Sequence, residues 1–318
     1  MSEKRDLLSI DDLSPEELNK IIDWAISAKQ DDGLFEEFMP LTGLTIGSIY
    51  EKPSTRTRVS FEVGIDKLGG NPLTLLKGDI QLGKSESIED TASVLSRYLG
   101  AITYRCFGHE DVEKLAKGST VPVINALSDK HHPCQAAADM MTIAENFDEL
   151  AGIKVAWVGD GNNVLHDLML GAASLGMKMH YAVPKGFEPD EKIVSRAKDI
   201  AKETGGTVDM THDPVEAVKE ANVVYTDVFI SMGEEHLKDK IKAFEGFQVN
   251  EELVSNADSN YIFMHCLPAH RGEEVTNGVI DSKNSVVFDQ AENRMWAQLS
   301  LLTFLIHPPA WEAFSELH

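Results

Sequence analysis

The chain has 318 residues, enough for about two domains, and its 42% hydrophobic and 25% charged residues are ordinary for a globular protein. Its 52 acidic residues outnumber its 29 basic residues, and the net charge of −23 makes nucleic acid or an anionic membrane a poor partner. The three cysteines form no C-x-x-C pair and no apolar run reaches about 18 residues, which argues against a disulfide framework, structural zinc and a transmembrane helix.

Strands and helices are predicted to alternate along the first half of the chain. The first helix begins after Ser14, because Pro15 suits the first helical position and Glu17 completes a capping box. Further helices are predicted from about residue 56 to 69, up to about residue 99, over 110–116 and from 133 to about 147. The predicted strands span 44–50, 73–76, 101–104 and 121–125.

The second half repeats this alternation. Its predicted strands span 153–158, 179–183, 207–210, 222–227, 261–264 and 286–288, and its predicted helices span 165–175, 191–203 and about 292–306. Strands that alternate with helices form parallel sheets covered on both faces. We therefore predict an α/β fold of two doubly wound domains, each with a central parallel sheet flanked by helices. They span residues 1–148 and 149–291, and the C-terminal helix within 292–318 is expected to pack back on the first domain.

A cluster of hydrogen-bond donors stands where the first predicted strand and its loop lead into a helix. The sequence Ser54-Thr55-Arg56-Thr57-Arg58 supplies three hydroxyls and two guanidinium groups. A helix N-terminus adds free N–H groups and the positive end of the helix dipole, so the segment is typical of a phosphate site. The alternative is an ordinary helix start with solvated arginines, and the density of donors favours the anion site.

His132 is a second candidate, within His131-His132-Pro133-Cys134-Gln135. Pro133 is predicted to open a helix, whose positive end would lower the imidazole pKa and favour a neutral ring that donates one hydrogen bond. A loop histidine with purely structural bonds is one alternative. A metal ligand is disfavoured because no carboxylate or cysteine stands at ligand spacing on one face.

Cys266 and Asp227 stand at the ends of predicted strands in the second domain. Ligands of open parallel sheets gather beyond the carboxyl ends of strands. Cys266 lies in His265-Cys266-Leu267-Pro268, and Asp227 precedes the loop with Ser231-Met232-Gly233. The carboxylate of Asp227 could hold an ammonium group. For Cys266 the alternative is a small buried side chain without a chemical role, which is the more frequent role of a single cysteine.

The turn Gly159-Asp160-Gly161-Asn162-Asn163 is similar to a dinucleotide-binding fingerprint between a strand and a helix. Val164 stands where the third glycine is required, and the next predicted strand runs into Val183-Pro184 without an acidic residue. A nicotinamide cofactor is therefore not expected.

Together and in this order, these segments resemble the carbamoyltransferases, and among them the branch that acts on ornithine. The resemblance covers nearly the whole chain. The Ser-Thr-Arg-Thr-Arg run, the His-Pro-Cys-Gln run and Arg105 match what the superfamily uses for carbamoyl phosphate. Asp227, the Ser-Met-Gly loop and the His-Cys-Leu-Pro run match the ornithine branch, and aspartate carbamoyltransferases lack that loop and the cysteine of that run.

The resemblance implies roles for individual residues. Those that would bind carbamoyl phosphate are Ser54, Thr55, Arg56, Thr57, Gln81, Arg105, His132, Pro133, Cys134, Gln135, Cys266, Leu267 and Arg294. Those that would bind ornithine are Asn163, Asp227, Ser231 and Met232. The residues expected in catalysis are Arg105, His132, Asp227 and Cys266. Neither a metal nor an organic cofactor is required.

The implied reaction transfers the carbamoyl group of carbamoyl phosphate to the δ-amine of L-ornithine and gives L-citrulline and phosphate, a step of arginine metabolism. Three alternatives remain: a carbamoyltransferase for another amine such as putrescine, a nucleotide-dependent oxidoreductase and a non-catalytic binding protein. The resemblance also implies a homotrimer or an assembly of trimers with active sites at subunit interfaces, reached by the loop 81–87. A cytoplasmic location is expected, because the first twelve residues lack the apolar core of a signal peptide.

Overall fold

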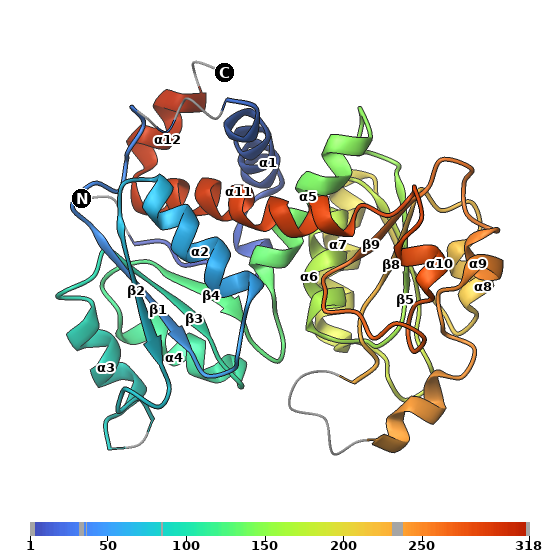
Figure 1. Ribbon diagram of the computed structural model, residues 1–318, viewed down its shortest axis with the longest axis horizontal. Helices are drawn as coiled ribbons and strands as arrows, with labels where there is room; N and C mark the ends of the chain where they lie inside the picture. Colours follow the sequence, from blue (N-terminus) through green and yellow to red (C-terminus); the bar gives the residue numbers. More distant parts are fainter. Residues whose placement is uncertain (1–3, 32–34, 36, 84, 231–237, 316–318) are drawn as a thin grey trace. The chain divides into compact units, whose positions relative to one another are not determined.

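The structure is a computed structural model that describes residues 4–31, 35, 37–83, 85–230 and 238–315 (Figure 1). The chain divides into two compact units. Unit 1 comprises Met1–Met141 with Glu292–His318, and unit 2 comprises Thr142–Ala291. Each unit contains one parallel sheet with flanking helices, which confirms the predicted α/β class. Along the chain, the first boundary between the two units lies between residues 141 and 142, inside the helix Pro133–Asn146. The sequence predicts this boundary between residues 148 and 149.

Unit 1 is built on four parallel strands in the order β2-β1-β3-β4. The strands are β1 (Thr45–Tyr50), β2 (Asn71–Leu76), β3 (Ala101–Arg105) and β4 (Val123–Leu127). Its helical elements are η1 (Ile10–Asp12), α1 (Pro15–Gln30), α2 (Arg56–Lys67), α3 (Ile88–Leu95), α4 (His109–Gly118) and α12 (Pro308–Ser315). Two further helices, α5 (Pro133–Asn146) and α11 (Val287–Ile306), each have one end in unit 1 and the other in unit 2.

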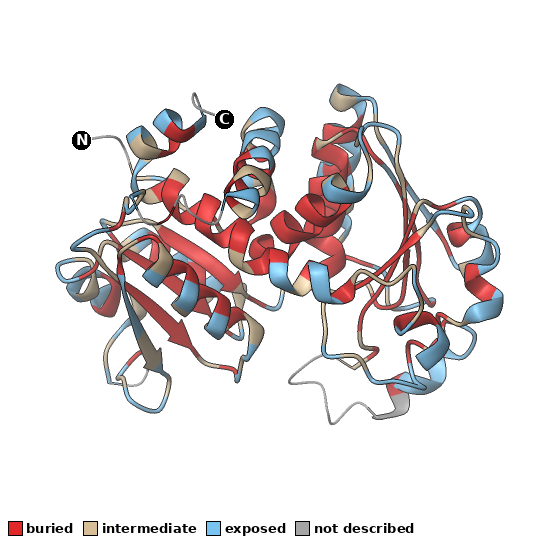
Figure 2. Ribbon diagram, turned by 45° about the horizontal axis from the view of Figure 1, so that its top comes forward, coloured by how far each residue is buried: buried red, intermediate tan, exposed pale blue. Residues whose placement is uncertain are grey.

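Apolar packing holds the strands of unit 1 to their helices. A buried cluster joins Ile49 and Ile102 of the sheet to Ala92 of α3 and Leu115 of α4. Elsewhere in the unit, α2 packs against α11, since a Cβ at Gly64 would lie 3.2 Å from the Leu299 side chain. The predicted start of α1 is confirmed, because the Ser14 hydroxyl accepts a hydrogen bond from the amide of Glu17 at 3.2 Å. Figure 2 shows buried strands in the sheets, and in unit 1 these are β1, β3 and β4, whereas the edge strand β2 is exposed or half-buried.

Unit 2 is built on five parallel strands in the order β7-β6-β5-β8-β9. The strands are β5 (Lys154–Val158), β6 (Lys178–Ala182), β7 (Thr207–Thr211), β8 (Val223–Thr226) and β9 (Ile262–His265). Its helical elements are α6 (Asn163–Ser174), α7 (Glu191–Thr204), α8 (Pro214–Val218), η3 (Lys238–Phe244), α9 (Glu251–Val254) and α10 (Asn277–Ile280). Among the described residues, no helix has the length and apolar character needed to span a membrane.

The predicted strand over 286–288 is wrong. Val287 and Phe288 begin α11, which therefore starts before the predicted residue 292. Val287 is 1% exposed and Phe288 is 71% exposed, so the short run alternates as an edge strand would. Periodicity cannot separate the two structures over so few residues. The helical turns that follow decide the outcome, and a separate helix, α12, comes after α11.

Gly161, in the turn between β5 and α6, allows the backbone of this turn to approach the backbone at Phe187 closely. Its amide donates to the carbonyl of Phe187 at 3.0 Å, and an added Cβ would lie only 2.4 Å from that oxygen. We expect Gly161→Ala to lower the free energy of unfolding by about 1–3 kcal/mol, since the backbone must shift to admit the methyl group. Urea unfolding measures the change. Gly78→Ala, where an added Cβ meets nothing within 4 Å, is the control, and equal midpoints for both variants would contradict the close approach.

Candidate active site

The carboxyl ends of β1 and β3 form the edge of the unit 1 sheet to which the sequence assigns carbamoyl phosphate. β2, which follows β1 in the chain, pairs with one side of β1, and β3 pairs with the other side. The strand order therefore reverses between β1 and β3. Such a reversal opens a crevice in which ligands of parallel sheets bind. The loop before α2 follows β1, and Arg105 is the last residue of β3.

The N-terminus of α2 presents polar groups beside this edge. Thr55 precedes the helix, and its side chain makes no capping hydrogen bond. Ser54 is half-buried, Thr55 is exposed, and Thr57 is buried in the first turn. A helix start without a side-chain cap leaves its first amide groups available to an anion. This geometry fits the predicted phosphate site.

Two buried guanidinium groups meet at the hydroxyl of Thr57. Arg294 of α11 donates to it from Nη2 at 3.0 Å, and Arg105 donates from Nη1 at 3.5 Å. Arg294 also donates from Nη1 to Oε1 of Gln135 at 2.6 Å, and Gln135 in turn donates to Asp139 at 2.8 Å. Arg105 is 8% exposed and Arg294 is 2% exposed. The structure thus joins four residues that the sequence assigns to carbamoyl phosphate but that lie far apart in the chain.

His132 is buried directly before α5. Burial holds the pKa of its imidazole well below the ordinary value of 6.5, and the positive charges of Arg294, Arg105 and Arg56 lower this pKa further. The ring is therefore neutral near pH 7 and can donate one hydrogen bond to a ligand. The sequence predicts the same direction from the helix end, but burial and the neighbouring arginines are the causes found in the structure.

The remaining predicted residues of unit 1 have different surroundings. The thiol of Cys134 is buried and donates to the carbonyl of Asn125 at 3.5 Å, which is a structural bond. Pro133 is the first residue of α5. Gln81 is exposed, and its side-chain oxygen accepts a hydrogen bond from the hydroxyl of Ser85 at 3.0 Å.

Lys52 is a charged residue of this edge that the sequence analysis did not single out. Its side chain is 8% exposed, and its ammonium lies 4.7 Å from the ring centre of Phe107. Burial lowers the pKa of this ammonium, and the charge of Arg105 lowers it further. The position of Lys52 between β1 and α2, beside the Ser-Thr-Arg-Thr-Arg run, is the signal that could have identified it.

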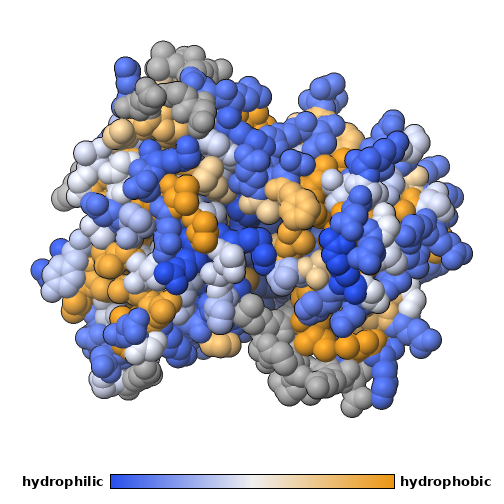
Figure 3. Space-filling view, viewed as in Figure 1, coloured by the Kyte–Doolittle hydropathy of each residue, from blue (hydrophilic) through white to orange (hydrophobic). Residues whose placement is uncertain are grey.

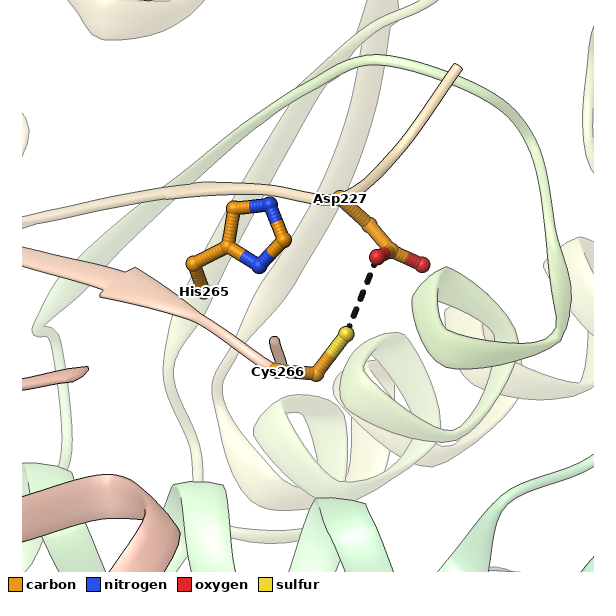
Figure 4. A group of neighbouring side chains, drawn as sticks. All are labelled: Asp227, His265 and Cys266. Atoms are coloured by element: carbon orange, nitrogen blue, oxygen red, sulfur yellow. Dashed lines mark hydrogen bonds between the residues drawn. The ribbon is translucent and has the colours of Figure 1, made fainter. Parts of the chain in front are cut away.

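In unit 2, Asp227 and Cys266 lie together beyond the ends of β8 and β9 (Figure 4). The Cys266 thiol donates to Oδ1 of Asp227 at 3.0 Å. The same oxygen accepts from the amide of Val228, and Oδ2 accepts from Nδ2 of Asn162, both at 2.8 Å. Asp227 is 6% exposed, so these bonds fix the orientation of a buried carboxylate. The strand order reverses here between β5 and β8, as it does between β1 and β3 of unit 1.

His265 supports the segment that carries Cys266. Its side chain is fully buried, and its Nδ1 accepts from the amide of Leu267 at 2.8 Å. The proton therefore lies on Nε2, which donates to Oε1 of Glu274 at 3.2 Å. The backbone of Leu267 has a φ of +58°, in the left-handed region, so the bond from its amide to His265 helps to hold an unfavourable conformation.

Asp227, His265 and Cys266 have potential metal ligand atoms within 4.8 Å of one another. Both ring nitrogens of His265 already take part in hydrogen bonds, so only the carboxylate and the thiol remain as ligands. Zinc sites in proteins use three or four protein ligands. The geometry therefore fits a hydrogen-bonded amine site better than a metal site.

The predicted ornithine residues are only partly described. Asn163 is half-buried and is the first residue of α6. The preceding Asn162, which the sequence analysis did not assign to ornithine, caps α6 by accepting from the amides of Val164 and Leu165. Ser231 and Met232 lie outside the described residues.

Comparison with known protein families covers both units. A model of the carbamoyl-phosphate-binding domain of aspartate/ornithine carbamoyltransferases matches residues 5–145, and a model of their Asp/Orn-binding domain matches residues 151–305. The chain belongs to this family. The resemblance predicted from the sequence motifs is thereby confirmed.

Individual relatives agree with this assignment. The chain is 52% identical to the catabolic ornithine carbamoyltransferase of Thermoplasma acidophilum, over 95% of the chain and 99% of that protein. It is 53% identical to the anabolic enzyme of Pyrococcus furiosus, over 95% of the chain and 96% of that protein. A solved structure of ornithine carbamoyltransferase from Pyrococcus furiosus superimposes with a TM-score of 0.92 and covers 95% of this chain and 97% of its own.

The depressed pKa of His132 predicts a pH-dependent stability. Between the low folded-state pKa and the ordinary value of 6.5, the unfolded chain binds a proton on this residue that the folded chain does not bind. Stability is therefore lost as pH falls below 6.5, by up to about 1.4 kcal/mol per pH unit from this residue. We expect urea unfolding between about pH 5 and pH 8, the range in which histidine titrates, to show a shallower loss of stability for His132→Asn than for the wild type. Identical slopes for the variant and the wild type would contradict a neutral buried imidazole.

Proposed function

We propose that the protein is an ornithine carbamoyltransferase, which transfers the carbamoyl group of carbamoyl phosphate to the δ-amine of L-ornithine and releases L-citrulline and phosphate. The observation that carries this choice within the family is the buried pair of Asp227 and Cys266. A buried carboxylate attracts an acceptor that carries ammonium groups and repels an acidic acceptor such as aspartate. The names of the relatives support the same choice.

Carbamoyl phosphate is proposed to bind to unit 1. Ser54, Thr55, Arg56 and the amide groups at the start of α2 hold the phosphate. Arg105, neutral His132 and Thr57 donate hydrogen bonds to the carbonyl oxygen, on which negative charge grows as the tetrahedral intermediate forms. One donor of this kind lowers the activation free energy by about 3–4 kcal/mol.

The remaining residues assigned to carbamoyl phosphate complete this part of the proposal. Arg294 donates hydrogen bonds to both Gln135 and Thr57. It thereby fixes the position of Thr57, one of the donors to the carbonyl oxygen. Pro133 and Cys134 place the start of α5. Gln81, Cys266 and Leu267 contact the same substrate once the active site is assembled.

The nucleophile is the δ-amine of ornithine. A lysine-like amine has a pKa near 10.4, so forming the neutral amine at pH 7 costs roughly 4.6 kcal/mol. Asp227 and Cys266 orient the amine and draw its proton away. The neutral amine attacks the carbonyl carbon and forms the C–N bond of the tetrahedral intermediate. The collapse of this intermediate breaks the C–O bond to phosphate, and the departing phosphate accepts the remaining proton. Asn163, Ser231 and Met232 bind the α-ammonium and α-carboxylate groups.

A homotrimer, or an assembly of trimers, is the proposed quaternary structure, with carbamoyl phosphate sites completed by Gln81 of a neighbouring subunit. Large apolar side chains on unit 1 support an interface of this kind. They are 41–75% exposed and include Val59, Val63, Leu73, Leu76, Val94, Tyr98 and Phe107. Figure 3 shows apolar patches on an otherwise mostly hydrophilic surface. A cytoplasmic role in arginine metabolism completes the proposal.

The choice of acceptor is tested by measuring carbamoyl transfer to L-ornithine, putrescine, L-aspartate and N-acetylornithine in parallel. We expect turnover with ornithine to exceed turnover with each of the others, because Asp227 favours a cationic acceptor and Asn163 favours a free amino acid. Faster turnover with putrescine would retain the carbamoyl phosphate site and replace the ornithine assignment. Binding without turnover of any amine would indicate a binding protein.

Arg105→Ala tests the polarisation of the carbonyl group. We expect kcat to fall about 10²–10³-fold, the usual loss when one donor to a developing oxyanion is removed. Steady-state citrulline formation measures the loss, and circular dichroism reports whether the variant folds. Arg97→Ala, which removes an exposed guanidinium of the same unit, is the matched control. Wild-type kcat in Arg105→Ala would contradict the proposed role.

A further inference from the structure

A nearly buried ion pair lies among the residues of unit 2 to which no role has been assigned. The ammonium of Lys240, in η3, is 2.7 Å from Oδ2 of Asp160, and the two side chains are 5% and 10% exposed. The same ammonium lies 5.5 Å from the ring centre of Phe187 and 6.0 Å from that of Phe244. A buried ion pair is costly to form and is often no more stable than apolar side chains of similar size, so its presence calls for a role other than stability.

Asp160 belongs to the turn that holds the carboxylate of Asp227. Asn162, two residues further along, donates to Oδ2 of Asp227 at 2.8 Å, and the proposed ornithine ligand Asn163 follows. The turn is also fixed through its backbone. The carbonyl of Asp160 accepts from Nε1 of Trp157 at 3.0 Å, and the amide of Gly161 donates to the carbonyl of Phe187 at 3.0 Å.

The charge of Lys240 matters because two buried carboxylates stand at one edge of the sheet. Asp160 follows β5 and Asp227 follows β8, and these strands are neighbours. The two segments are close, since a Cβ on Gly159 would lie 3.8 Å from the backbone carbonyl of Asp227. Lys240 neutralises Asp160 and leaves Asp227 as the carboxylate that meets the amine. Without Lys240, a second buried negative charge would repel the α-carboxylate of an amino acid.

We propose that Lys240 is a positioning residue for the amino-acid substrate: its ion pair with Asp160 fixes the turn 159–163 and thereby holds Asn162 against Asp227. This inference rests on the proposed function. It concerns the acceptor alone, because all four residues belong to unit 2, whereas the guanidinium groups assigned to phosphate belong to unit 1.

Lys240→Met tests whether Lys240 positions the ornithine site alone or supports the whole active site. We expect the KM for ornithine to rise about 10- to 100-fold, the range that corresponds to losing one hydrogen bond to a charged group. The KM for carbamoyl phosphate should stay at its wild-type value. Lys242→Met, which changes an exposed lysine of the same helical segment, is the matched control and should leave both KM values unchanged. A wild-type ornithine KM in Lys240→Met would overturn the inference.

A double variant, Lys240→Met with Asp160→Leu, distinguishes positioning from stability and remains informative if the single variant does not fold. Replacing both charges with apolar side chains removes the buried unpaired carboxylate, so we expect the unfolding midpoint to return towards the wild-type value. The ornithine KM should stay raised because the turn has lost its anchor. A double variant with a wild-type ornithine KM would overturn the inference while leaving the proposed function intact. A wild-type enzyme that makes no citrulline from ornithine would instead refute the proposed function, and the inference would fall with it.

Discussion

Charge held out of water at the carboxyl ends of two parallel sheets is the constraint on which the rest of this structure depends. Arg105 and Arg294 in unit 1, and Asp227 in unit 2, are each at least nine-tenths buried. An isolated buried charge is expensive, so every one of them is held by neighbouring hydrogen-bonding groups. The hydroxyl of Thr57 and the amide of Asn162 serve this purpose without neutralising the charge. Each edge therefore keeps an oriented charge that a ligand of opposite sign can satisfy.

The buried charges of the two units have opposite signs, and each sign suits one of the two proposed substrates. The three arginines that act on the pKa of His132 belong to unit 1, and the carboxylate that Cys266 contacts belongs to unit 2. In the proposed function, a dianionic phosphate and a cationic amine are thus recognised by separate parts of the chain. The local cluster of arginines also makes the proposed anion site compatible with a net charge of −23, because a short-range field dominates inside a site of low dielectric constant.

Strand ends account for most of what the sequence could predict. Arg105, Asp227 and Cys266 directly follow or end apolar runs, and parallel topology brings such positions to one edge. The partners of these groups were harder to foresee. The bonds from Arg294 to Thr57 and from Lys240 to Asp160 join residues that are distant in sequence, and no local pattern encodes them. The predicted strand over 286–288 is wrong for a different reason, since a short apolar alternation fits a strand and a helix start equally well.

His132 shows how the two kinds of information combine. Its place before a proline at the start of α5 is a local feature, and it correctly indicates a neutral ring. The larger part of the effect comes from burial, followed by Arg294, Arg105 and Arg56, which the fold collects from three other segments. A protonated imidazole among three guanidinium groups would add a fourth positive charge to a buried cluster. The neutral ring avoids that repulsion and still offers an N–H donor, so the fold obtains polarising power at this position without further buried charge.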